Sequence, residues 1–66
     1  MKWFKAIREN SGLTQGKLAQ KVGVERSLIS KFETGSARPS PDTAKAIAEV
    51  LGFEWTKFYD EEQESA

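Results

Sequence analysis

Residues 23–35 read GVERSLISKFETG, and the pattern in this stretch decides which fold the chain is expected to adopt. With about 100° of rotation per residue, its large apolar side chains fall on one side of a helix. These residues are Leu28, Ile29 and Phe32. Gly35 follows the last residue of the pattern, where a glycine often ends a helix. The stretch therefore predicts an amphipathic helix that begins after Glu25 and ends near Thr34.

The opposite side of this helix carries only hydrogen-bond donors and no acidic residue. Its members are Arg26, Ser27, Ser30, Lys31 and Thr34. A merely solvated face would more often pair glutamate with lysine at a spacing of four. Arginine and lysine donate to O6 and N7 of guanine, and serine or threonine can contact bases or phosphates. The pattern therefore favours a helix that lies in the major groove of DNA over an ordinary solvated helix.

A second predicted helix lies just before this one and ends at Gly23. The GVE turn at residues 23–25 is too short for antiparallel packing, so the two helices are expected to cross steeply in a helix-turn-helix. In that geometry the N-terminus of the first helix meets the sugar-phosphate backbone, where free amides and the helix dipole attract phosphate. The candidate phosphate-binding residues at this N-terminus are Thr14, which is also the expected N-cap, Gln15 and Lys17.

Helical signals also cover the rest of the chain. The pattern predicts helices from about Lys2 to Asn10, from Pro41 to a stop at Gly52, and from about Trp55. Five short helices, with no strand signal and no repeat, predict an all-α domain. We expect residues 1–59 to form this domain, and residues 60–66, DEEQESA, to form a frayed acidic tail.

The aromatic residues near the chain ends have two interpretations. Trp3, Trp55 and Tyr59 are expected mainly to pack over a small core. The alternative is self-association, since aromatic residues are enriched at protein interfaces. We therefore regard Trp55 and Tyr59 as a candidate dimer surface.

The composition excludes several classes of function. The chain has 66 residues and neither cysteine nor histidine, which removes disulfides, thiolate chemistry, the usual zinc sites and the commonest general base. We expect no metal, no cofactor and no enzymatic activity, since no serine or threonine has an imidazole or thiol to work with. No apolar run approaches the roughly 20 residues that span a bilayer, and the N-terminus does not resemble a signal peptide. A soluble cytoplasmic protein is expected.

The charge is unevenly distributed along a chain of zero net charge. Residues 1–45 hold nine basic and four acidic residues, whereas residues 46–66 hold one basic and six acidic residues. Such asymmetry suggests that one part of the molecule meets a polyanion, although chance in a short chain is the plain alternative.

These motifs together resemble a known family. From Ile7 to about Phe58, the segments LTQGKLAQKVGV, ISKFETG and IAEVLG are similar in content and order to lambda-repressor-like helix-turn-helix proteins, the Cro/repressor or XRE group. The resemblance implies a compact five-helix domain that binds operator DNA, usually as a symmetric dimer.

The resemblance also implies roles for individual residues. Arg26, Ser27 and Lys31 match positions that read bases, to which the helix pattern adds Ser30. Positions that commonly hold phosphate are matched by Gln15, Thr34 and Arg38. Arg8 and Glu33 match a pair that links the first helix to the third, the alternative being two unpaired surface charges.

Four positions depart from the family pattern. Glu25 replaces the usual Ser or Thr cap, and it could repel DNA or accept from a cytosine amino group. Gly16 and Lys17 replace a more usual acidic start of the second helix, and a glycine there costs about 0.5–1 kcal/mol. Leu28 stands where a small or polar residue is common, and it is expected either to meet a thymine methyl group or simply to pack.

Two functions from different classes follow. The first is a sequence-specific transcriptional regulator, a repressor in our expectation, that inserts its third helix into operator DNA as a dimer. The second is a protein-interaction module on the same fold, such as an antitoxin or a coactivator piece. In that case residues 54–66 would bind a basic partner that the sequence does not identify.

Overall fold

A computed structural model of the protein describes residues 1–59, and this part of the chain is all-helical. The elements are α1 (Lys2–Asn10), α2 (Gln15–Val22), α3 (Arg26–Thr34), α4 (Pro41–Leu51) and the 3₁₀ helix η1 (Trp55–Tyr59). The all-α prediction is confirmed. The predicted acidic tail, residues 60–66, lies outside the described residues.

The helix ends follow from local sequence. The Thr14 hydroxyl accepts from the Lys17 backbone N–H at 3.0 Å, and the Ser40 hydroxyl accepts from the Thr43 N–H at 3.4 Å. Gly23 closes α2 with φ of 89°, in the left-handed region that glycine enters at little cost. Glu25 precedes α3 without a side-chain capping hydrogen bond, as its weak capping ability predicts.

The last helix differs from the prediction in type. It is a single 3₁₀ segment of five residues rather than a further α-helix. The segment is anchored at its end, because Phe58 is fully buried and the Tyr59 hydroxyl donates to the Pro39 carbonyl at 3.0 Å. A 3₁₀ turn suits a piece this short.

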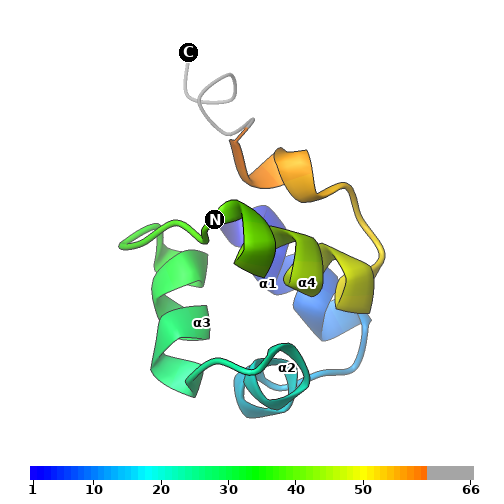
Figure 1. The fold of residues 1–66 in the computed structure, drawn as a ribbon. Helices are drawn as coiled ribbons and strands as arrows, with labels where there is room; N and C mark the ends of the chain where they lie inside the picture. Colours follow the sequence, from blue (N-terminus) through cyan, green and yellow to red (C-terminus); the bar gives the residue numbers. More distant parts are fainter. Residues whose placement is uncertain (60–66) are drawn as a thin grey trace.

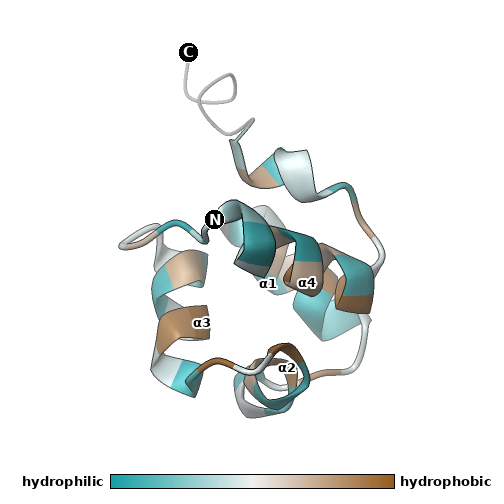
Figure 2. Ribbon diagram, viewed as in Figure 1, coloured by the Kyte–Doolittle hydropathy of each residue, from teal (hydrophilic) through white to brown (hydrophobic). Residues whose placement is uncertain are grey.

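The helices pack around one core and leave α3 at the edge of the molecule. In Figure 1, α3 runs along one side while α2 is seen nearly end-on, so the two helices cross steeply, as expected for a helix-turn-helix. Figure 2 shows hydrophobic and hydrophilic segments alternating along the ribbons of α2, α3 and α4, as in helices with one buried face. The fully buried large side chains are Phe4, Leu18, Ile29, Phe32, Ile47 and Phe58.

The aromatic residues hold η1 against α1. The Phe58 ring lies 5.4 Å from the Phe4 ring and 5.2 Å from the Trp3 ring, measured between centroids. Trp55 and Tyr59 are half-buried and pack against the core, in edge-to-face contact at 5.8 Å. The packing interpretation of these residues is confirmed, and their role in a dimer stays a prediction.

No helix within residues 1–59 combines the length and the apolar character that crossing a membrane requires.

Candidate nucleic-acid interface

The outward side of α3 is open to solvent. Arg26, Ser27, Lys31 and Thr34 are exposed and Ser30 is half-buried, whereas Ile29 on the opposite side is fully buried. The helix therefore presents the donor-rich side that its sequence pattern predicts. An open hollow lies on this side, lined by Gln15 of α2 and by Arg26, Ser27, Ser30 and Lys31 of α3.

The chemistry of this hollow suits an electron-rich partner. Two cationic side chains, two hydroxyl groups and one amide line it, and none of the five residues is acidic. Guanidinium and ammonium groups donate to guanine O6 and N7 and to phosphate oxygens. The site fits a base edge or a phosphate better than it fits a cation.

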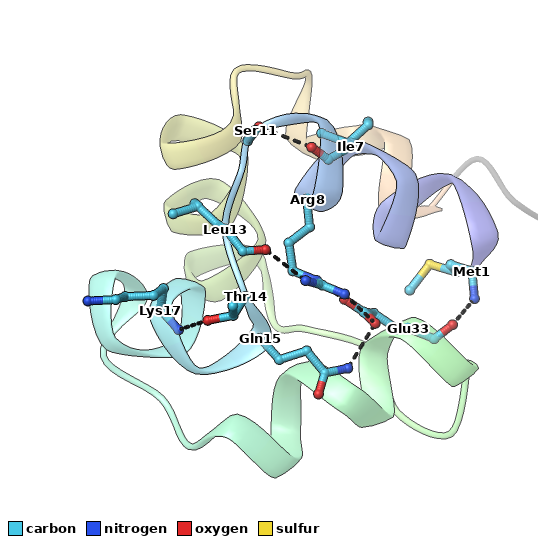
Figure 3. Close-up of polar contacts among 9 residues, drawn as sticks. All are labelled: Met1, Ile7, Arg8, Ser11, Leu13, Thr14, Gln15, Lys17 and Glu33. Carbon is cyan, nitrogen blue, oxygen red and sulfur yellow. Dashed lines mark hydrogen bonds and ion pairs between the residues drawn. The ribbon is translucent and has the colours of Figure 1, made fainter.

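Behind the hollow lies an ion pair that joins α1 to α3. The Arg8 Nε lies 2.5 Å from Glu33 Oε2, and only 9% and 6% of the two side chains is exposed. The Arg8 Nη1 also donates to the Leu13 carbonyl at 2.7 Å (Figure 3). The ion pair expected from the family resemblance is present, and the alternative of two unpaired surface charges is wrong.

Gln15 connects this ion pair to the hollow. Its Nε2 donates to Glu33 Oε1 at 2.9 Å, and its Oε1 points away from Glu33 in Figure 3. Because an ionised carboxylate can only accept, the amide nitrogen must face Glu33. One hydrogen of the Gln15 amide is then used inside the protein, and the other is available to an acceptor outside it.

The same network explains why an acid is tolerated on α3. The Glu33 carboxylate accepts from both Arg8 and Gln15, so its charge is compensated inside the domain. Within residues 1–59, no buried polar side-chain atom lacks a hydrogen-bond partner. Sequence reasoning missed the Gln15 link and the Leu13 carbonyl, because neither leaves a periodic signal.

The other predicted phosphate residues do not line the hollow. Thr14 and Lys17 are exposed at the start of α2, and the Lys17 side chain points away from Gln15 in Figure 3. Thr34 lies at the end of α3, where its hydroxyl donates to the Lys31 carbonyl at 3.2 Å. Arg38 is exposed in the loop between α3 and α4. The four residues therefore lie on three segments: the start of α2, the end of α3 and the loop between α3 and α4.

Leu28 and Glu25 occupy two of the positions that depart from the family pattern. Leu28 is half-buried and packs against the core, which accounts for an apolar residue at that position. Glu25 is exposed at the start of α3. Among residues 1–59, no group of three or more His, Cys, Asp and Glu residues is arranged to hold a metal ion.

Comparison with known proteins places these features in a family. The sequence profile of a helix-turn-helix family matches residues 4–58. The HTH-type transcriptional regulator YqaF of Bacillus subtilis is 37% identical over 60 residues, which are 91% of this chain and 79% of that protein. The immunity repressor protein of Bacillus phage phi105 is 38% identical over 59 residues, 89% of this chain and 41% of the repressor.

A third similar protein is named for a different role. Antitoxin HipB of Escherichia coli O6:H1 is 34% identical over 53 residues, 80% of this chain and 56% of the antitoxin. The chain thus spans less than two thirds of the phage repressor and of the antitoxin, but more than two thirds of YqaF. No solved structure gives a significant match.

Proposed function

This chain belongs to the lambda-repressor-like helix-turn-helix family, and we propose that it is a sequence-specific DNA-binding protein that regulates transcription as a repressor. Its role is binding, and we assign it no catalytic step. The observation that carries the proposal is the uncovered, donor-only side of α3 beside the N-terminus of α2. The phage repressor and YqaF, both similar over most of the chain, support the regulatory role.

The proposed contacts divide into two groups. On α3, Arg26 and Lys31 donate to guanine edges in the major groove, and Ser27 and Ser30 contact neighbouring bases. The backbone contacts that set the register come from Thr14, Gln15, Lys17, Thr34 and Arg38. For Thr34, the hydroxyl exchanges its hydrogen bond to the Lys31 carbonyl for one to the phosphate. Thr14 can serve both as cap and as phosphate donor, because its oxygen accepts the capping bond while its hydrogen stays available.

The charge of the described domain supports this assignment. Residues 1–59 hold ten basic and six acidic residues, a net charge of +4 that the zero charge of the whole chain conceals. A positive domain attracts DNA and gives an affinity that falls with salt as counterions are released. We propose residues 1–59 as the DNA-binding domain and residues 60–66 as an acidic extension of it.

We also propose that two copies bind one operator. Members of helix-turn-helix families that bind as dimers read two half-sites related by twofold symmetry. The half-buried aromatic pair Trp55 and Tyr59 is the candidate contact between the copies.

Replacing both proposed guanine contacts tests the function. Wild type should select a common site from a pool of random duplexes, and the Arg26→Ala, Lys31→Ala double variant should select none. Each bidentate base contact contributes about 1–3 kcal/mol of discrimination, so losing both removes about 2–6 kcal/mol. The variant should keep its fold in circular dichroism, because both side chains are exposed.

A matched variant controls for the lost charge. Lys2 and Lys5 are exposed residues of α1, so Lys2→Ala, Lys5→Ala also removes two positive charges. It should lower affinity slightly and select the same site as wild type. If the α3 variant also selects the wild-type site, α3 does not read the bases.

The similarity to an antitoxin favours a second candidate, a protein-binding role. In that role the acidic residues 54–66 bind a basic protein. Deleting residues 60–66 separates the functions: unchanged operator binding with loss of a co-purifying partner supports the protein-binding role, whereas loss of operator binding contradicts it.

A further inference from the structure

Gly16, in the first turn of α2, faces Arg26 at the start of α3. A Cβ atom built on Gly16 would lie 3.8 Å from the Cδ of Arg26, an ordinary van der Waals distance. Unlike the four other glycines, Gly16 does not have a positive φ. Its backbone therefore does not require glycine, and what the absent side chain provides is open space beside Arg26.

The Arg26 side chain that borders this space is unpaired. Among residues 1–59 the structure contains one ion pair, which joins Arg8 to Glu33 and does not involve Arg26. Arg26 is exposed and lines the hollow next to Gln15. Its planar guanidinium group is thus available to donate two parallel hydrogen bonds to one partner.

A carboxylate at position 16 would take up those donors. In glutamate the carboxylate carbon lies two bonds beyond Cβ, and in arginine the guanidinium carbon lies two bonds beyond Cδ. Side chains that start 3.8 Å apart and extend by the same number of bonds can bring these groups together. Arginine and carboxylate then form a paired, charge-assisted contact that competes with guanine.

We propose that Gly16 is a specificity-determining position: by carrying no side chain it leaves the Arg26 guanidinium unpaired, so that two of its N–H groups reach one guanine. This inference rests on the proposed function, because it concerns how the same α3 face reads its operator. It assigns Gly16 a positioning role that acts through the Arg26 side chain.

The test uses four single variants and one double variant on the operator that wild type selects from random duplexes. Arg26→Ala first identifies the base pair that Arg26 reads, as the pair at which discrimination is lost. Gly16→Glu should then lose discrimination at that same pair, within the range of about 5-fold to 150-fold that one bidentate contact supplies. Gly16→Ala should discriminate as wild type does. Gly16→Gln has the size of glutamate without its charge, so it should lose less discrimination than Gly16→Glu.

The readout is the ratio of affinities for the operator and for the operator changed at that pair. A new carboxylate also repels phosphates, but this lowers binding to both duplexes and leaves the ratio unchanged. Adding Gly16→Glu to Arg26→Ala should not change the ratio further. Folding is not at risk, since a glutamate in the first turn is favoured by the helix dipole, and circular dichroism checks this.

The outcomes separate the two proposals. If wild type selects an operator and Gly16→Glu keeps the wild-type ratio, the role of Gly16 is wrong while the proposed function stands. Equal losses in Gly16→Gln and Gly16→Glu would also overturn it, because crowding rather than ion pairing would be the cause. If wild type selects no site, the proposed function fails and this inference fails with it.

Discussion

Arg8 and Glu33 show how a single pair of residues lets an acid occupy the helix proposed to face DNA. Both side chains are nearly buried, and Glu33 also accepts from Gln15 at the edge of the hollow. Three elements, α1, α2 and α3, therefore meet at one carboxylate. The charge needed to hold the helices together is the same charge that would otherwise repel phosphate.

Removing either member of this pair should destabilise the domain strongly. Arg8→Ala or Glu33→Ala leaves the other charge buried without its partner, which costs about 3–5 kcal/mol. Replacing both by apolar residues, Arg8→Met with Glu33→Leu, should cost less than either single change, because no unpaired charge remains. Urea unfolding with linear extrapolation measures each free energy of unfolding.

Glu9 provides the control for that experiment. It is an exposed acidic residue next to Arg8 in α1, and Glu9→Ala should change stability by no more than about 0.5 kcal/mol. Similar losses in Glu9→Ala and Glu33→Ala would mean that the buried pair does not hold α1 and α3 together.

Among the elements, α2 and α4 begin in the same way but face different surroundings. Thr14 caps α2 at the proposed DNA surface, and Ser40 caps α4, which contributes no residue to the hollow. The two helices therefore allow the structural role of a cap to be separated from its proposed phosphate contact.

Thr14→Ala and Ser40→Ala should each destabilise the domain by about 1 kcal/mol, the usual cost of losing an N-cap side chain. Only Thr14→Ala should also weaken DNA binding, and it should do so equally for the operator and for an unrelated duplex, because phosphate contacts carry no sequence information. Thermal unfolding and fluorescence anisotropy with labelled duplexes measure the two effects. If the two variants bind DNA with equal affinity, Thr14 does not contact a phosphate.

For the whole molecule, the proposed dimer predicts the layout of the operator. Two copies related by twofold symmetry should bind inverted half-sites whose centres lie about 34 Å apart, one turn of the duplex. Inserting five base pairs between the half-sites turns them to opposite faces of the DNA and should abolish joint binding. Sedimentation of the complex with labelled duplex gives the number of bound copies.

An insertion of ten base pairs is the matched control for that experiment, since it returns the half-sites to one face of the DNA at a larger distance. Binding of one copy should survive in both altered duplexes. If two copies still bind together after the five-base-pair insertion, they do not contact each other through a fixed surface.

The sequence by itself determined where the helices lie and which side of α3 faces outward. These features depend on neighbours within about one helical turn: Thr14 and Ser40 cap the helices that follow them, Gly23 and Gly35 allow the left-handed ends, and apolar spacing selects the buried side. Local interactions of this kind are nearly independent of the rest of the fold.

Only the tertiary structure decided which side chains meet across elements. The donation from Gln15 to Glu33 joins residues 18 positions apart, and the donation from Tyr59 to Pro39 joins residues 20 apart. The open space that Gly16 leaves beside Arg26 likewise exists only because α2 crosses α3 steeply. Such contacts depend on the angles at which helices pack, and those angles are set by the whole core rather than by any stretch of sequence.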